Sequence, residues 1–227
     1  MGADIGRHQR TIAVRGRARL EGKKLYVPGD ISSAAFFLVA GLLVPESNLV
    51  LQNVGLNPTR SAILDFFTQM GAAVSVVNLV SKQGELIGDL SVKGAHLKGG
   101  VISGELVPLL IDELPMLAAL GPFTEQGIEI RDAQELRVKE SDRIAALAEN
   151  LKRMGATVEE RPDGLRVEGR SAARLRGTEI DPRGDHRIAM AFAVAGLAAT
   201  GDTVIVDADC AAVSYPTFFT ELRRVSQ

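Results

Sequence analysis

Runs of small apolar residues, each opened by an aspartate, recur three times along the chain. The runs are Asp30 onward in GDISSAAFFLVAGLL, Asp112 onward in DELPMLAALGPF and Asp185 onward in DHRIAMAFAVAGLAA. Because these segments are apolar nearly all round, the pattern predicts helices that are buried on every side. A carboxylate at a helix start also suits the free backbone N–H groups and the macrodipole. Helix capping is therefore one interpretation of each aspartate.

Each apolar run is followed by an alternating stretch and then by an amphipathic one. The alternating stretches, which predict strands, are SNLVLQNV, GIEIRDA and DTVIVDA. The amphipathic stretches, which predict helices, are TRSAILDFFTQMGA, ESDRIAALAENLKRMGA and YPTFFTELRRV. Two of them end in Met-Gly-Ala, at Met70 and Met154, where Gly71 and Gly155 suit a left-handed helix end. A predicted hairpin follows each Met-Gly-Ala, in AVSVV with LSVKG and in TVEER with LRVEG.

This internal repeat predicts an α/β (α+β) domain of three βαβαββ units, with buried helices inside and sheets outside. We expect the domain to span residues 29–227. Residues 1–28 stand apart from it. There, TIAVRGRA and KKLYVPG predict two strands joined by a turn at Glu21-Gly22.

Composition and charge narrow the class of function. The 227 residues are 46% hydrophobic, which is enough to bury a core. A net charge of −2 with scarce aromatic residues and no Trp argues against nucleic-acid binding. The polar start and the short apolar runs predict neither a secretory signal nor a membrane span, so we expect the cytoplasm. Cys210 is expected to be a small core residue, and the Cys and His spacing predicts no metal site.

Charged side chains are concentrated in LRVKESDR, residues 136–143, before a helix that is expected to begin near Ser141 as N-cap. Cations at a helix N-terminus oppose the usual placement of acids, and such departures mark functional sites. The motif therefore predicts a binding site for a phosphorylated or carboxylated small molecule. A solvated run of internal ion pairs is the alternative. The charged members are Arg137, Lys139, Glu140, Asp142 and Arg143.

A second cluster lies in PRGDHRIAMAF and comprises Arg183, Asp185, His186 and Arg187. Arg187 lies at the start of an apolar helix, and a buried arginine needs an anionic partner. Its planar guanidinium group can form two parallel hydrogen bonds to a phosphate or carboxylate. His186 taken alone has a structural interpretation beside the functional one. Because Asp30, Asp112 and Asp185 occupy equivalent repeat positions, we expect them to gather near LRVKESDR. Carboxylates there would transfer protons while cations hold a ligand.

The segments VPGDISSAAFFL, DELPMLAAL, LRVKESDRI, Met-Gly-Ala and GDHRIAMAF, in this order, resemble the C-terminal half of the 5-enolpyruvylshikimate-3-phosphate (EPSP) synthase family. The resemblance covers about Lys24 to Gln227. It implies a transferase of the shikimate pathway of aromatic amino acid biosynthesis, which moves the enolpyruvyl group of phosphoenolpyruvate to shikimate 3-phosphate and releases phosphate. It implies no metal or organic cofactor. In this family the herbicide glyphosate competes with phosphoenolpyruvate, but the response of this chain stays open because Val213 could alter the phosphonate site.

The resemblance also implies roles for individual residues. Asp112 matches the general base that faces the shikimate hydroxyl, and Glu140 matches the carboxyl group that moves a proton to and from the methylene carbon of phosphoenolpyruvate. Lys139 matches a lysine that contacts the substrate, and Arg143 and Arg187 match the two arginines that hold phosphoenolpyruvate. The substrate-binding positions implied in this way are Lys139, Arg143, Arg187, His186 and Asp30, the last two with less defined roles.

The chain also departs from the family pattern. Members normally have two such domains with the catalytic cleft between them, and this chain matches one of them. We therefore expect residues 1–28 to be remnant strands and crossover of the other domain, the N-terminal half to be a partner, and the isolated chain to have little activity. Val213 stands where the family often has a phosphate-binding lysine, and Glu135 where some members have a substrate-contacting asparagine.

Three alternatives stay open at this point. One is another enolpyruvyl transferase, which acts on UDP-N-acetylglucosamine. A second is a non-catalytic module that binds anions or supports assembly. The third is an RNA-binding domain of similar topology, which the net charge of −2 disfavours.

Overall fold

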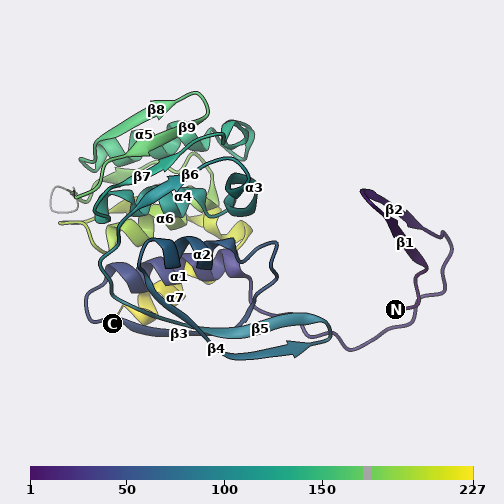
Figure 1. Ribbon diagram of the computed structural model, residues 1–227. Coiled ribbons are helices and arrows are strands. Elements are labelled where there is room, and N and C mark those ends of the chain that lie inside the picture. The colour runs from purple at the N-terminus through teal and green to yellow at the C-terminus, as the bar shows by residue number, and fades with distance from the viewer. Residues whose placement is uncertain (171–174, 227) are drawn as a thin grey trace.

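The computed structural model describes residues 1–170 and 175–226 (Figure 1). In chain order the elements are β1 (Ile5–His8), β2 (Thr11–Val14), α1 (Ile31–Leu43), β3 (Asn48–Gly55), α2 (Ala62–Gln69), β4 (Ala73–Lys82), β5 (Glu85–Lys93), β6 (Gly100–Ile102), α3 (Leu106–Leu110), α4 (Leu114–Leu120), the 3-10 helix η1 (Gly121–Phe123), β7 (Ile128–Ile130), the 3-10 helix η2 (Gln134–Val138), α5 (Arg143–Arg153), β8 (Val158–Arg161), β9 (Gly164–Val167), β10 (Glu179–Ile180), α6 (His186–Gly196), β11 (Val204–Ile205), the 3-10 helix η4 (Ala208–Val213) and α7 (Phe218–Val225).

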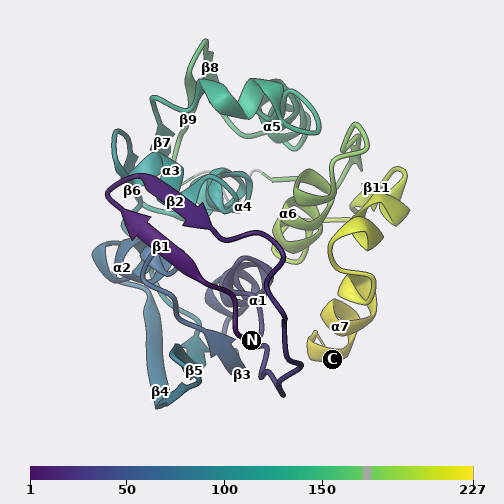
Figure 2. The same cartoon turned by 90° about the vertical axis from the view of Figure 1, so that its right-hand side faces the viewer.

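The three apolar runs form α1, α4 and α6, which pack against one another in the middle of the body (Figure 2). Leu38, Leu117 and Phe192, one from each helix, are fully buried. The sheets and the other helices surround this trio, as the repeat predicts. Among the described residues, no helix is long and apolar enough to cross a membrane.

The sheets repeat the same arrangement with one difference. One sheet has the order β3-β5-β4, and a second has the order β6-β7-β9-β8, so both predicted hairpins, β4–β5 and β8–β9, are present. In the third unit β10 pairs with β11 in parallel, and residues 206–226 form η4 and α7 without a further hairpin. Val204 of β11 is consequently 55% exposed. The threefold fold is confirmed, with a shorter third unit within the described chain.

The first residues differ from the sequence prediction. The hairpin pairs β1 with β2, around Gln9, and lies away from the body (Figure 1). Residues 15–28 form no strand. A strand needs a neighbouring edge, and the Tyr26 N–H donates instead to the side chain of Gln83. Regular pairing resumes only at Gly29, which bridges Val54 in parallel.

The predicted helix starts are only partly correct. Asp30 caps α1 and Asp185 caps α6 through their carboxylates. Asp112 caps no helix, because the extra helix α3 precedes it and Glu113 occupies the start of α4. The cap of α5 is Asp142, whose carboxylate accepts from the Ala145 N–H, and not Ser141. The left-handed helix ends at Gly71 and Gly155 are confirmed, with φ of 78° and 96°.

We expect Gly41→Ala to lower the free energy of unfolding by about 1–2 kcal/mol. A Cβ at Gly41 would meet Val92 Cγ1 at 2.7 Å, and overpacking of this kind costs roughly 1–3 kcal/mol. The helical propensity of alanine offsets only about 1 kcal/mol of it. Denaturant unfolding followed by circular dichroism measures the difference. In a Val92→Ala background the same substitution should become neutral or stabilising, and an equal loss in both backgrounds would contradict the prediction.

Candidate active site

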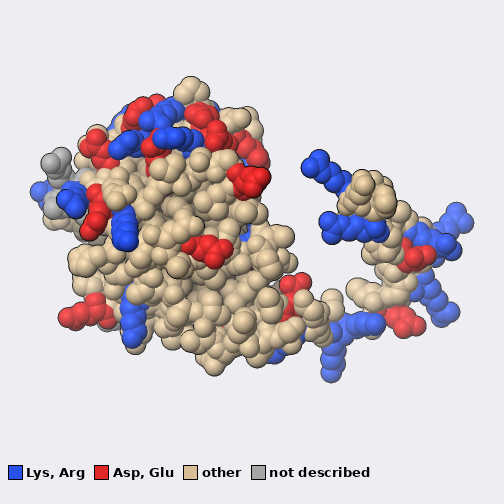
Figure 3. All heavy atoms as spheres, viewed as in Figure 1, with Lys and Arg blue, Asp and Glu red and all other residues tan. Residues whose placement is uncertain are grey.

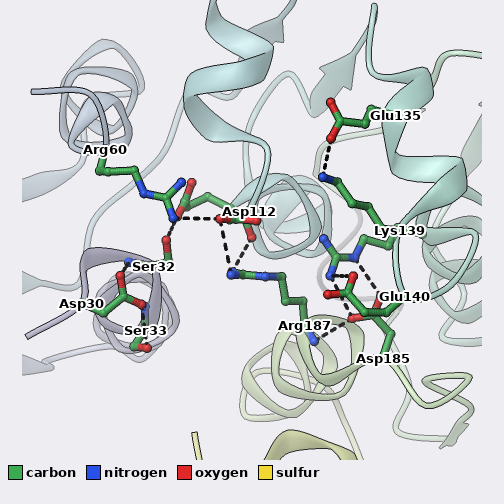
Figure 4. Close-up of polar contacts among 12 residues, drawn as sticks. Asp30, Ser32, Ser33, Arg60, Asp112, Glu135, Lys139, Glu140, Asp185 and Arg187 are labelled. Atoms are coloured by element: carbon green, nitrogen blue, oxygen red, sulfur yellow. Dashed lines mark hydrogen bonds and ion pairs between the residues drawn. The ribbon is translucent and has the colours of Figure 1, made fainter. Parts of the chain in front are cut away.

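The charged residues of the two sequence clusters meet where α1, α4 and α6 begin and where the loop before α5 passes over them (Figure 4). All seven predicted site residues lie in this region, and all but His186 take part in the ion pairs or helix caps found there among the described residues. The seven are Asp30, Asp112, Lys139, Glu140, Arg143, His186 and Arg187. We refer to them, together with Arg60, Glu113 and Asp185, as the acid–arginine cluster.

Asp112 lies between two arginines from other parts of the chain. Its Oδ2 is 3.0 Å from Nη2 of Arg60 and 3.5 Å from Nη2 of Arg187. Arg187 also donates from Nη1 to the backbone carbonyl of Asp112, at 2.9 Å. The Asp112 side chain is 21% exposed, so one face of the carboxylate remains open. Two guanidinium groups therefore hold an oriented carboxylate that solvent can still reach.

Arg143 is enclosed by carboxylates. Its Nε donates to Asp185 Oδ2 at 2.8 Å and its Nη2 to Oδ1 at 3.3 Å, while Nη2 also donates to Glu140 at 2.6 Å. The Arg143 and Asp185 side chains are 1% and 0% exposed. Burial alone would raise the pKa of Asp185, but the bonds and charge of Arg143 outweigh it and hold this pKa below its usual range. The pair is a buried, ionised link between α5 and α6.

Lys139 and Glu140 present the accessible ends of the motif. Lys139 forms an ion pair with Glu135, four positions earlier. The Glu140 side chain is 50% exposed although it bonds Arg143. These neighbouring residues thus send their charged groups to different partners, the Lys139 ammonium to Glu135 and the Glu140 carboxylate to Arg143 (Figure 4).

His186 is the first residue of α6, and Asp30 is the N-cap of α1. Burial, followed by the charge of Arg187, lowers the pKa of His186, so the imidazole is neutral at neutral pH. The Asp30 carboxylate accepts from the Ser32 N–H and from both the N–H and the hydroxyl of Ser33. The capping interpretation of Asp30 is therefore confirmed, and because Asp30 is also exposed, its substrate-binding role stays a prediction.

Sequence analysis missed three members of the region, namely Ser32, Arg60 and Glu113. The Ser32 hydroxyl donates to the carboxylate of Glu113, and both side chains are 3% exposed. Burial raises the pKa of Glu113 against the opposing effect of this bond. A charged residue inside the apolar DELPM run was the available signal for Glu113. Nothing local signals Arg60, because its partner Asp112 is 52 positions away.

Val213 and Cys210, which the sequence also pointed to, both lie on η4. Val213 lies at the end of η4 and is 81% exposed. Cys210, on the same 3-10 helix, is half-buried, so the prediction of a core cysteine is wrong. Burial followed by the charge of Asp207 raises the pKa of the Cys210 thiol, which is the opposite of what a nucleophile needs.

A family model described as EPSP synthase (3-phosphoshikimate 1-carboxyvinyltransferase) matches residues 1–222. The chain belongs to the EPSP synthase family. It is 54% identical over 226 residues to the 3-phosphoshikimate 1-carboxyvinyltransferase of Solibacter usitatus, a match that covers 100% of this chain and 53% of the relative. The chain therefore spans about half the length of the curated relatives it matches.

Solved structures agree with this family. The EPSP synthase from Acinetobacter baumannii superposes with a TM-score of 0.90 and 39% identity, over 99% of this chain and 52% of that one. The enolpyruvyl transferase NikO from Streptomyces tendae superposes with a TM-score of 0.73 and 20% identity, over 99% of this chain and 50% of its own. The second likeness shows the fold alone, and it confirms the enolpyruvyl transferase architecture.

Proposed function

We propose that this chain is the C-terminal half of an EPSP synthase and forms one wall of its active site. The observation that carries the proposal is the oriented Asp112 carboxylate, held by Arg60 and Arg187 within the acid–arginine cluster. Phosphoenolpyruvate and shikimate 3-phosphate are both anions, so cations are needed to hold them, and carboxylates are needed to transfer protons.

In the proposed reaction Asp112 accepts the proton of the shikimate 5-hydroxyl as the oxygen attacks C2 of phosphoenolpyruvate. Glu140 delivers a proton to the methylene carbon, which becomes a methyl group in the tetrahedral adduct. Glu140 then takes a proton back from that methyl group as the C2–O bond to phosphate breaks, which re-forms the carbon–carbon double bond and gives the enol ether product. Lys139 precedes Glu140 in the chain and is proposed to supply positive charge to the transferred group, in exchange for its present ion pair with Glu135 (Figure 4).

The two arginines are proposed to hold the phosphoenolpyruvate anion. Arg187 is 15% exposed and Arg143 is 1% exposed. Arg143 would reach an anion through Nη2, whose present partner is the half-exposed carboxylate of Glu140. Because a buried guanidinium always needs an anionic partner, ligand binding would exchange one anion for another there.

We propose that the partner is the N-terminal half of the same enzyme and that residues 1–28 belong to the junction with it. The β1–β2 hairpin is two-stranded and exposed, and such hairpins are marginally stable alone. Ile12 and Val14 are more than half exposed. Residues 1–28 form an arm that carries many basic side chains (Figure 3), namely Arg7, Arg10, Arg15, Arg17, Arg19, Lys23 and Lys24.

We expect the purified chain alone to release no phosphate from the two substrates, because half of the cleft is missing. Mixing or co-expressing it with the N-terminal half of the Solibacter usitatus relative should produce turnover. A phosphate-release assay measures both, with each half alone as the control. Substituting UDP-N-acetylglucosamine for shikimate 3-phosphate should abolish release. Ordinary turnover by this chain alone, or no turnover by a complex that size-exclusion chromatography shows to have formed, would overturn the proposal.

A further inference from the structure

The Arg137 guanidinium, at the end of η2, is surrounded by oxygen atoms from two other parts of the chain. Its Nη1 lies 2.9 Å from Asp142 Oδ2 and 3.0 Å from Glu160 Oε1. Its Nε donates to the carbonyl of Pro162 at 2.9 Å, and its Nη2 donates to the carbonyl of Arg161. The last three partners lie at or beside the turn of the β8–β9 hairpin. One side chain therefore fastens the motif to that hairpin.

These contacts exclude Arg137 as a free anion-binding group. Burial alone would lower the pKa of this guanidinium, but its bonds to Asp142 and Glu160 outweigh burial and raise it. The cation is thus neutralised by two carboxylates of the chain itself. For this residue the internal ion-pair interpretation of LRVKESDR is the correct one.

The contacts of Arg137 lie on both sides of the segment from Lys139 to Ser141. Arg137 precedes it, and Asp142 follows it and caps α5. Within the described chain, no backbone hydrogen bond outside the regular elements is donated by Glu140 or Ser141. Side-chain bonds at the ends of this short loop therefore help to set its position.

The far side of the loop is fastened separately. The Ser141 hydroxyl donates to Asp185 at 3.2 Å, and Arg143 bonds both Asp185 and Glu140. The loop is therefore held between α6 on one side and the β8–β9 hairpin on the other. Arg137 makes the second of these links through several bonds. Backbone N–H groups of Asp132 and Ala133 also donate to Asp163 of the same turn, but these residues lie before η2.

We propose that Arg137 is a positioning residue, which sets Lys139 and Glu140 in place by tying their loop to the β8–β9 turn. The proposal rests on the roles proposed above for Lys139 and Glu140. Its physical basis is the steep dependence of rate on geometry, since a displacement of about 1 Å at a catalytic group costs roughly 10²-fold. Arg137 itself does not need to touch substrate.

The isolated chain tests the structural half of this proposal. Arg137→Met should speed hydrogen–deuterium exchange in the peptide that contains Lys139, Glu140 and Ser141, and leave the α6 peptide unchanged. Arg166→Met is the matched control, because Arg166 is an arginine of the same hairpin, half exposed, with one ion-pair contact at 3.7 Å. Unchanged exchange in the Arg137→Met loop peptide would overturn the proposal, whatever the enzymatic activity.

The assembled enzyme tests the functional half. At a temperature where every variant is folded, Arg137→Met should lower kcat by about 10- to 100-fold, with a smaller change in the KM for shikimate 3-phosphate. Arg137→Lys should recover part of the loss, and Arg166→Met should match the unsubstituted chain. A kcat that is unchanged while only the melting temperature falls would reduce Arg137 to a stabilising residue and overturn the proposal. If the assembled enzyme without substitutions shows no turnover, the proposed function is wrong. Hydrogen–deuterium exchange in the loop peptide would then still show whether Arg137 positions the loop.

Discussion

Asp185→Asn is expected to lower the free energy of unfolding of this chain by about 3–5 kcal/mol, because it leaves the Arg143 guanidinium buried without a full counter-charge. The Arg143 side chain is 1% exposed and cannot turn to water without breaking the contact between α5 and α6. The amide would also weaken the cap of α6, where Asp185 Oδ1 accepts from the Arg187 N–H at 2.9 Å. Denaturant titration followed by far-ultraviolet circular dichroism measures the loss.

The effect should depend on pH in a defined direction. Although burial alone would raise it, the pKa of Asp185 is lower in the folded chain than the usual value for an aspartate, because Arg143 bonds and neutralises the carboxylate. A depressed folded pKa contributes stability above the unfolded pKa, and this stability disappears as the pH falls through the folded value. The gap between the unsubstituted chain and Asp185→Asn should therefore be full near neutral pH and shrink below about pH 4. A gap that widens toward acid would contradict this linkage.

Two further variants separate the buried pair from ion pairing in general. Arg143→Met with Asp185→Leu replaces both charges by apolar groups and should recover much of the stability, since no charge is then left buried. Glu221→Gln breaks a pair with Arg224 whose side chains are 33% and 72% exposed, and it should cost less than about 1 kcal/mol. Equal losses for Asp185→Asn and Glu221→Gln would show that Arg143 is less enclosed than the structure indicates.

Much of the fold could be predicted because it depends on local pattern. The all-round apolar runs placed α1, α4 and α6 in the centre, and alternation placed the hairpins β4–β5 and β8–β9. Asp30 and Asp185 were predictable as caps, because capping involves only the next few backbone N–H groups. The arm was not predictable in the same way. A strand forms only where it pairs with a neighbour, and residues 15–28 pair with no strand.

The site was predictable in composition but not in pairing. LRVKESDR was correctly placed near Asp112 and Arg187 by the repeat, yet sequence spacing does not show which cations are already neutralised. Arg137 binds the β8–β9 turn, and Arg143 binds Asp185, 42 positions away. Such partners are set by tertiary packing. The sequence therefore overstated the free positive charge at the loop, while its prediction of carboxylates beside cations agrees with the arrangement found.

Asp112→Asn should lower the kcat of the assembled enzyme by about 10²- to 10⁴-fold, the range that general base catalysis contributes. Asparagine has nearly the same shape, and its carbonyl oxygen still accepts hydrogen bonds from Arg60 and Arg187. The contact between Arg187 and the Asp112 backbone carbonyl is also kept. The substitution therefore removes proton acceptance and leaves the position of the side chain largely unchanged.

The measurements must separate chemistry from binding and folding. We expect the KM for shikimate 3-phosphate to change far less than kcat, because the cations that hold the anion remain. Unfolding stability should change by about 1 kcal/mol or less, since the 21%-exposed side chain stays solvated. Asp65→Asn, which alters an exposed carboxylate on α2 outside the acid–arginine cluster, is the control and should keep full turnover. If Asp112→Asn keeps more than about a tenth of the turnover, the proton of the 5-hydroxyl is accepted elsewhere, and the half-exposed Glu140 becomes the carboxylate to test for that role.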